Sequence, residues 1–203
     1  MIKNIVFDLG NVLISFRPSE YFDKKNYPGN VKAKILSDIF GSKEWRMLDN
    51  GEITTPEVID AIALKSSLKR EEIAHIFNLR TEVIFPLDQN VKVLPELKKQ
   101  GFRLYFLSNF PADLFKEIKT GYYFFNYFDG GIISAEAKSS KPDSRIYKTL
   151  LEKYSLIAEE CLFIDDLEIN VTAAEAEGMK GMVTFGSLEI SREVENTLLR
   201  ISG

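Results

Sequence analysis

Short apolar runs that stop abruptly on a polar side chain are the feature that most constrains the fold of this chain. The five runs lie at about residues 3–8, 102–108, 131–134, 161–165 and 180–185. Asp8, Ser108 and the pair Asp165–Asp166 are polar groups that stand at the ends of three of these runs. Continuous rather than alternating apolar runs are typical of parallel strands that are buried on both faces. The sequence therefore predicts a parallel sheet whose strands finish in polar side chains.

Helical patterns separate these runs. Asp143 to Leu156 carries apolar residues at helical spacing, and Glu168 to Gly178 ends on a glycine suited to a C-cap. Asn90 to Gln100 also has a helical pattern, in which Pro95 marks a kink or the true start. Strands that alternate with helices predict an α/β sandwich with right-handed crossovers.

One interval interrupts this alternation, because more than ninety residues separate Asp8 from the next strand at Phe102. A crossover needs only about a dozen residues. Most of the interval has helical patterns, at residues 18–26, 31–40, 45–48, from 55 onward and 69–83. We therefore expect a helical cap domain at 16–86, inserted into an α/β core domain made of 1–15 and 87–203. Such an insertion would hang over the carboxyl edge of the sheet as a lid above Asp8.

Composition narrows the class of function. The 203 residues carry a net charge of −4, with 26 Lys and Arg against 30 Asp and Glu, which provides no basic field for nucleic acid. No apolar run approaches the ~20 residues of a membrane span, and the chain starts directly with a strand-like segment rather than a signal peptide. The single Cys161 opens an apolar run and is interpreted as a core residue. We expect a cytoplasmic protein that acts on a small molecule.

The polar groups at the strand ends are expected to form one site, because ligands bind at the carboxyl ends of parallel strands. Asp8 is either a structural cap of the following turn or a nucleophile. Gly10 favours the second interpretation, since a glycine lets the backbone approach a ligand closely. A carboxylate in that setting is able to attack phosphorus.

The adjacent carboxylates Asp165 and Asp166 would repel each other without a cation. Mg²⁺ removes this conflict, and it commonly takes one or two carboxylates together with substrate phosphate. The alternative is an exposed acidic N-terminus of the following helix, which the helix dipole would favour.

The remaining candidates for this site are Lys141, Ser108 and Asn109. Lys141 would supply positive charge against a transferring phosphoryl group, while Ser108 and Asn109 would donate hydrogen bonds to phosphate oxygens. Taken singly, each has an ordinary structural interpretation, as a surface lysine or as turn residues after a strand. Their order along the chain makes the combination specific.

In that order the sequence resembles the haloacid dehalogenase-like hydrolase superfamily over essentially its whole length. The resemblance rests on four motifs, Phe-Asp-Leu-Gly-Asn-Val at 7–12, Leu-Ser-Asn at 107–109, Lys-Pro at 141–142 and Ile-Asp-Asp-Leu-Glu-Ile-Asn at 164–170. It implies a three-layer, Rossmann-like α/β sandwich with a helical cap after the first strand.

The resemblance also implies roles for individual residues. Asp8 would be the nucleophile that forms an aspartyl-phosphate intermediate, Ser108 would bind the phosphoryl group, and Lys141 would stabilise its charge. Asp166, with Asp165, would hold Mg²⁺ together with Asp8 and the carbonyl of Gly10.

One position departs from the family pattern. Most phosphatases of the family carry a second Asp two positions after the nucleophile as general acid/base, and here that position is Gly10. Such a group contributes about 10²–10⁴-fold in rate. The start Phe-Asp-Leu-Gly-Asn-Val resembles a subgroup with bacterial sugar-1-phosphate (glucose-1-phosphate) phosphatases. Because an anomeric oxygen leaves more easily than an ordinary alcohol, a sugar phosphate is the favoured substrate.

Two alternatives remain open. Metal-independent 2-haloacid dehalogenases of the superfamily also lack the second Asp, but they do not need the pair Asp165–Asp166. A non-catalytic phospholigand-binding protein would explain Gly10 as lost catalysis. A receiver domain is shorter and places its acidic pair early, so the order of motifs disfavours it.

Within the expected cap, Arg17, Trp45, Arg46 and His75 are candidates to face the cleft. A lone Trp on a helix is more often core, and His75, a possible substitute for the missing acid, more often lies on a solvated face. Arg17 is a candidate hinge or substrate contact. The sequence names neither the substrate nor the oligomeric state, which we expect to be a monomer or a homodimer.

Overall fold

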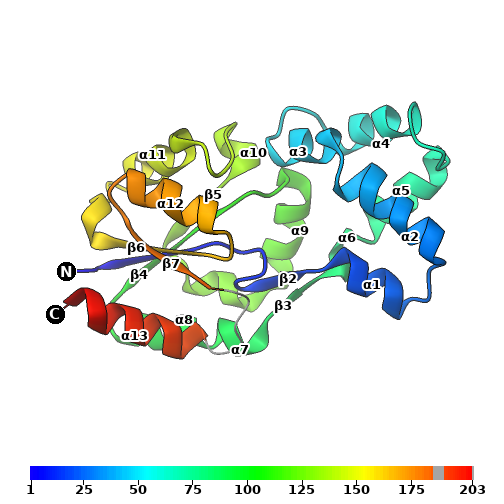
Figure 1. Ribbon diagram of the computed structural model, residues 1–203. Helices are drawn as coiled ribbons and strands as arrows, with labels where there is room; N and C mark the ends of the chain where they lie inside the picture. Colours follow the sequence, from blue (N-terminus) through cyan, green and yellow to red (C-terminus); the bar gives the residue numbers. More distant parts are fainter. Residues whose placement is uncertain (185–189, 203) are drawn as a thin grey trace.

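The central sheet is parallel and has β1 in its middle (Figure 1). The structure is a computed structural model that describes residues 1–184 and 190–202. Within those residues the sheet has the order β5-β4-β1-β6-β7. Its strands are β1 (Asn4–Phe7), β4 (Arg103–Ser108), β5 (Gly130–Ile133), β6 (Cys161–Asp165) and β7 (Lys180–Val183). The prediction of five parallel strands is confirmed, although residue 185, at the end of the last predicted run, lies outside the described residues.

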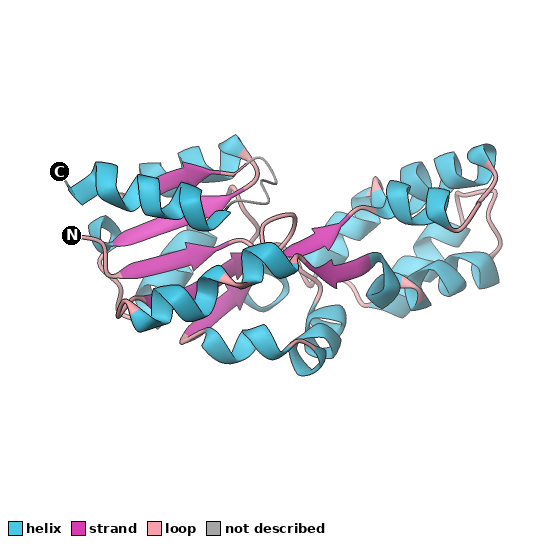
Figure 2. Ribbon diagram, turned by 90° about the horizontal axis from the view of Figure 1, so that it is seen from below, coloured by secondary structure: helices cyan, strands magenta, loops and turns pink. Residues whose placement is uncertain are grey.

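Helices cover both faces of this sheet, as Figures 1 and 2 show. One face packs against α7 (Asp88–Val91), α8 (Val93–Lys99), α9 (Ala112–Gly121) and α13 (Ile190–Ser202). The other packs against α11 (Ser144–Lys153) and α12 (Glu168–Ala176). Alternate residues of β1 serve the two layers, since Ile5 belongs to the first apolar cluster and Val6 to the second. The predicted three-layer α/β sandwich is confirmed.

Local signals explain where these helices begin and end. The Asp143 side chain caps α11 by accepting a hydrogen bond from the backbone N–H of Arg145 at 2.9 Å. Beyond α12, Gly178 has φ +89°, a conformation that favours glycine. The single helix predicted at 90–100 is instead two short helices, α7 and α8, with Pro95 in the first turn of α8 where no N–H partner is needed.

Most of the chain between β1 and β4 is helical. The elements there are α1 (Pro18–Lys24), α2 (Gly29–Ile35), the π-helical turn η1 (Leu36–Phe40), α3 (Lys43–Asp49), α4 (Thr55–Ala63), α5 (Arg70–Asn78) and α6 (Arg80–Val83). They enclose a separate apolar cluster that contains Phe22, Trp45 and Phe77. The segment 69–83, predicted as one helix, is divided at Leu79 into α5 and α6. We call residues 18–83 the helical region; it lies beyond the carboxyl ends of the strands (Figure 1).

A two-stranded ribbon joins the helical region to the rest of the molecule (Figure 2). It consists of β2 (Ile14–Phe16) and β3 (Ile84–Pro86), which pair antiparallel with Ile14 opposite Pro86. The sequence analysis did not predict these strands, because three residues are too few to display a period. The predicted domain limits at 16 and 86 both fall within the ribbon, and the division itself stays a prediction.

Side chains of the core also hold the end of α3 in place. The Ser134 hydroxyl, in the short helix α10 (Ser134–Ala137), donates to the carbonyl of Asp49, and the Lys138 ammonium donates to the carbonyl of Gly51. On the other side, Asp113 of α9 forms an ion pair with Arg80 at 2.8 Å. The helical region is therefore fixed over the strand ends by polar contacts.

Two 3₁₀ turns complete the described elements, η2 (Tyr123–Tyr127) and η3 (Ala158–Glu160). In the part of the chain that the structure describes, none of the helices combines the length and apolar character that crossing a membrane requires.

Candidate active site

The polar groups that end the central strands lie together at the carboxyl edge of the sheet. Asp8 follows β1, while Ser108 and Asp165 are the last residues of β4 and β6, the two strands that pair with β1. Lys141 reaches the same place from the loop before α11. All four are buried. The fold thus brings together residues that are up to 157 positions apart, as the order of motifs predicts.

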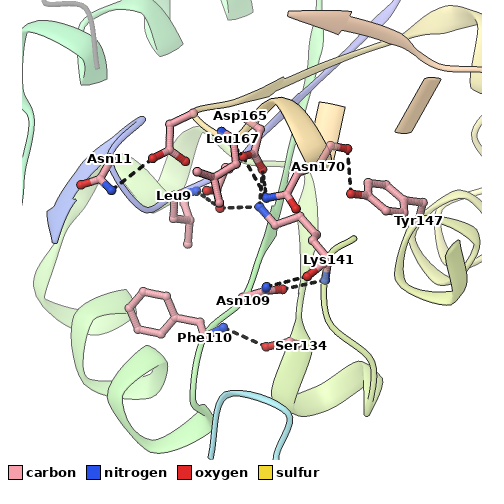
Figure 3. A network of polar contacts seen from close by, with 12 residues as sticks. Leu9, Asn11, Asn109, Phe110, Ser134, Lys141, Tyr147, Asp165, Leu167 and Asn170 are labelled. Atoms are coloured by element: carbon pink, nitrogen blue, oxygen red, sulfur yellow. Dashed lines mark hydrogen bonds and ion pairs between the residues drawn. The ribbon is translucent and has the colours of Figure 1, made fainter. Parts of the chain in front are cut away.

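Lys141 is the centre of this arrangement (Figure 3). Its Nζ lies 2.8 Å from Oδ1 of Asp8 and 2.6 Å from Oδ2 of Asp165. Its backbone is held by Asn109, whose Oδ1 accepts from the Lys141 N–H at 2.8 Å and whose Nδ2 donates to the Lys141 carbonyl at 3.0 Å. The Asn109 amide, predicted to bind phosphate, is therefore occupied with positioning Lys141.

Asp165 is saturated with hydrogen bonds. Its Oδ1 accepts from the Leu167 N–H at 2.9 Å and from Nδ2 of Asn170 at 3.0 Å, while Lys141 approaches Oδ2. The hydroxyl of Tyr147 donates to the Asn170 carbonyl at 2.9 Å and supports this partner in turn (Figure 3). Asn170 belongs to the motif at 164–170 but was not predicted as a site residue; its place in the first turn of α12, close after the acidic pair, was the available signal.

The carboxylates can hold a hard cation. One oxygen from each of Asp8, Asp165 and Asp166 lies within 4.8 Å of the others. Asp166 is half-buried, and of its two oxygens Oδ2 accepts from Nδ2 of Asn11 at 3.2 Å. Mg²⁺ prefers such oxygen ligands and needs few protein groups. The donor set therefore fits Mg²⁺. Asp166 is the freer ligand, because its oxygens accept fewer hydrogen bonds than those of Asp165.

The negative charges of the site exceed its positive charge, which favours binding of a cation. Burial raises the pKa of Asp8 to about 6, and the nearby Asp165 adds to this, although Lys141 and hydrogen bonding from Ser108 oppose it. Burial also raises the pKa of Asp166. Burial alone would lower the pKa of Lys141, but Asp8 and Asp165 outweigh it and raise that pKa. One ammonium does not fully offset the three carboxylates.

A small cavity of about 80 Å³ lies between this site and the helical region. Its lining is mostly apolar and comes from both sides: Gly10, Phe16, Trp45, Asp49, Ile84, Asn109, Phe110, Pro111 and Leu114. Trp45 is buried, as expected for a core residue, and stacks on Phe16 with ring centroids 6.1 Å apart. It nevertheless also lines the cavity. Asp49 is the acidic residue of this lining, and sequence reasoning missed it.

The other candidates of the helical region lie elsewhere. Arg17 is exposed and pairs with Glu20 at 3.2 Å, beside a different cavity. Arg46 is exposed and contacts the carbonyl of Gly41. His75 is exposed on α5, where it borders a third cavity. None of these three lines the cavity beside Gly10. The exposed position of His75 agrees with the solvated helix face expected for it.

Comparisons with known proteins agree with this geometry. The chain is 31% identical over 192 residues to the sesquiterpene phosphatase astK of Aspergillus oryzae, covering 95% of this chain and 94% of that protein. It is 24% identical to a phosphoglycolate phosphatase of Vibrio cholerae, over 91% of this chain and 85% of the relative.

A solved structure leads to the same family. A haloacid dehalogenase family enzyme from Bacteroides thetaiotaomicron, crystallised with magnesium and inorganic phosphate, superposes with a TM-score of 0.69 at 27% identity, covering 90% of this chain and 94% of that one. The family model for haloacid dehalogenase-like hydrolases matches residues 2–178. The chain therefore belongs to the haloacid dehalogenase-like hydrolase family.

Proposed function

We propose that this protein is a Mg²⁺-dependent phosphomonoester hydrolase that works through an aspartyl phosphate formed on Asp8. The observation that carries the proposal is the position of Lys141 Nζ between Asp8 at 2.8 Å and Asp165 at 2.6 Å, at the strand edge where Asp166 also lies. A buried ammonium that touches the nucleophile is placed to stabilise negative charge on a transferring phosphoryl group.

Each residue of the site has a part in this reaction. Asp8 attacks phosphorus in line and Lys141 neutralises charge on the phosphoryl oxygens. The Ser108 hydroxyl, which hydrogen-bonds to Asp8 in the free protein, is close enough to contact the same oxygens. Asp165 and Asn109 hold Lys141 in position. Phosphate leaves after water hydrolyses the aspartyl phosphate.

The cofactor is Mg²⁺. Asp8, the carbonyl of Gly10 and Asp166 would be its protein ligands, and Asp165 acts chiefly as the partner of Lys141 because its oxygens already accept hydrogen bonds. When bound, the cation neutralises phosphoryl oxygens and keeps Asp8 ionised. We therefore propose Asp166 as the direct ligand of the pair.

The substrate is a small phosphorylated metabolite, and its leaving group separates two possibilities. The resemblance to sugar-1-phosphate phosphatases favours a sugar phosphate. The cavity favours an apolar leaving group, since Phe16, Trp45 and Phe110 line it, and the relative from Aspergillus oryzae is named a sesquiterpene phosphatase. The oligomeric state and a cytoplasmic location stay predictions.

The test is phosphate release from a panel of monoesters, with Mg²⁺ and with EDTA. The panel contains sugar 1-phosphates, sugar 6-phosphates and a C15 isoprenoid monophosphate. Metal-dependent release is the expected result, and the preferred member identifies the substrate class. A sugar 6-phosphate hydrolysed as well as a sugar 1-phosphate would contradict the argument from the anomeric leaving oxygen.

The same assay separates the alternatives. A 2-haloacid dehalogenase would release chloride from 2-chloropropionate in EDTA and no phosphate from any ester. A non-catalytic phospholigand-binding protein would bind phosphate in the presence of Mg²⁺ without turnover. Either outcome would overturn the proposed phosphatase. Asp166, which a metal-independent enzyme does not need, provides a second check, because Asp166→Asn should raise the Mg²⁺ concentration required for activity.

A further inference from the structure

The backbone at position 10 leaves room for a side chain that Gly10 does not supply. A Cβ built on Gly10 would have Oδ2 of Asp8, 4.0 Å away, as its nearest atom among the described residues, chain neighbours aside. A Cβ beside the nucleophile would therefore meet no steric conflict. Gly10 and Asp49 border the same cavity, from opposite domains of the predicted architecture.

Asp49 lies at a helix end where a carboxylate is unfavourable. It is the last residue of α3, where the helix dipole favours a cation and disfavours a carboxylate. Its carbonyl is nevertheless fixed to the core by the Ser134 hydroxyl. Places where local preference is violated in a well-packed protein are often functional.

The charged neighbours of Asp49 do not neutralise it. Arg80 on α6 lowers the pKa of Asp49 by its charge, but its guanidinium is held by Asp113 at 2.8 Å and by the carbonyl of Phe77 at 2.9 Å. Lys138, beyond α10, donates instead to the carbonyl of Gly51. Within the described residues no ion pair joins Asp49 to a cation; its side-chain partner is Trp45, whose indole N–H donates to it.

These surroundings favour the protonated carboxyl. Burial raises the pKa of Asp49 from 3.8 to about 7, against the opposing effects of Arg80 and the hydrogen bond from Trp45. A group that titrates near neutral pH is able to donate a proton in one step and accept one in the next.

We infer that Asp49 is the general acid/base of this enzyme and performs, from the helical region, the role that position 10 cannot. The inference rests on the proposed phosphatase function. In the first step an oxygen of Asp8 bonds to phosphorus, the bond from phosphorus to the leaving oxygen breaks, and that oxygen takes the proton of Asp49. The products are an alcohol, the aspartyl phosphate and the Asp49 carboxylate.

The second step reverses the proton transfer. The Asp49 carboxylate takes a proton from water as the water oxygen bonds to phosphorus. The bond between phosphorus and the Asp8 oxygen breaks, which releases inorganic phosphate and restores the Asp8 carboxylate. Asp49 ends protonated, so the cycle is balanced without another proton carrier.

The leaving group provides the test, because an alkoxide needs a proton and a nitrophenolate does not. We would compare Asp49→Asn with wild type on an alkyl phosphate and on p-nitrophenyl phosphate, with Mg²⁺ saturating. Since kcat/KM reports the step that forms the aspartyl phosphate, it should fall about 10²–10⁴-fold for the alkyl ester and by less than about threefold for the nitrophenyl ester. The nitrophenyl reaction should show a burst of nitrophenol, because hydrolysis of the intermediate is slowed.

Asp60→Asn is the matched control. Asp60 is an exposed carboxylate of the neighbouring helix α4, paired with Arg70 at 2.7 Å, and its replacement should leave both substrates unaffected. Far-ultraviolet circular dichroism and Mg²⁺ binding by calorimetry, both unchanged in Asp49→Asn, show that the variant keeps its fold and metal site. In the double variant Gly10→Asp with Asp49→Asn, alkyl phosphate turnover should recover at least tenfold.

The possible failures are distinguishable. A wild-type protein that releases no phosphate would overturn the proposed function itself. Wild-type activity with equal losses on both esters in Asp49→Asn, or with no loss, would overturn the role of Asp49 and leave the phosphatase standing. Failure of Gly10→Asp to restore activity would refute the equivalence of the two positions.

Discussion

The two sides of the proposed site, which we call the core wall and the wall of the helical region, are built on different principles. On the core side, Asp8, Lys141 and Asp165 are buried and joined to each other or to backbone groups at distances of 2.6–2.9 Å. On the side of the helical region, one carboxyl, Asp49, is set among aromatic rings with Trp45 as its side-chain partner. The charged side chains of the first wall are fixed by mutual ion pairs and hydrogen bonds, whereas the Asp49 side chain is held by packing and by its contact with Trp45.

This difference separates two tasks. The core wall carries charges whose positions phosphoryl transfer requires for any ester, so its geometry is determined by the phosphoryl group. In the proposed mechanism the wall of the helical region faces the leaving group, whose size and acidity differ from one ester to another. Substitutions should therefore abolish activity on the first wall and change substrate discrimination or pH dependence on the second.

The largest expected effect is that of Asp8→Asn. An amide does not act as the nucleophile, so phosphate release should fall by about 10⁴-fold or more. The side chain is nearly isosteric, so thermal unfolding followed by circular dichroism should show the native fold. An active Asp8→Asn protein would exclude the covalent mechanism and remove the distinction between the two walls.

The next effect concerns stability. Lys141→Met removes the buried cation between Asp8 and Asp165 and leaves two carboxylates facing each other. Loss of one partner from a buried ion pair costs about 3–5 kcal/mol, which urea unfolding in EDTA should detect. Lys148→Met, at an exposed lysine of α11, is the control and should change the free energy of unfolding by less than about 0.5 kcal/mol. Equal effects of the two variants would contradict the central position of Lys141.

The third effect tests the opposite wall by pH. Because the pKa of Asp49 is raised to about 7, its protonated form is favoured by folding. Its contribution to stability is complete below pH 3.8 and is lost as the pH rises through 7. The free energy of unfolding of wild type minus that of Asp49→Asn should therefore fall by roughly 2–4 kcal/mol between pH 4 and pH 8, measured with urea in EDTA. A difference that does not vary with pH would show that Asp49 is ionised throughout.

The smallest effect is expected from Trp45→Phe. Phenylalanine keeps the stacking on Phe16 but removes the N–H that favours the ionised form of Asp49. The pKa of Asp49 should rise by up to about 1 unit, so the alkaline limb of kcat/KM for an alkyl phosphate moves to higher pH. Phe40→Leu disturbs the same aromatic cluster without removing a donor, and its alkaline limb should stay in place. A shift in both variants would assign the effect to packing.

The two walls also differ in how far sequence predicts them. Asp8, Ser108 and Asp165 end apolar runs, and a parallel sheet necessarily collects its carboxyl ends at one edge. Lys141 was identified by its order among these motifs, since an isolated Lys-Pro has no diagnostic pattern. The fold class follows from the same runs, because short continuous apolar segments that alternate with helical patterns are typical of buried parallel strands.

Asp49 was missed because its position depends on tertiary structure. In Leu48-Asp49-Asn50-Gly51 it has the appearance of the end of a helix before a turn. Only the packing of α3 over the strand edge brings it to the cavity beside Gly10. An acidic residue in the last turn of a helix, against the dipole, was the one local sign. The ribbon of β2 and β3 was missed for a related reason, since each strand pairs with a partner about seventy residues away.

That ribbon makes the helical region an exchangeable unit. The chain leaves the core through Ile14–Phe16 and returns through Ile84–Pro86, and these exits are adjacent because the two strands pair with each other. Another helical segment could be spliced between the same two strands without altering the spacing of Asp8 and Lys141. If the proposed mechanism holds, the choice of ester and the source of the proton can be replaced together, in evolution as in design, while the chemistry at phosphorus is inherited unchanged.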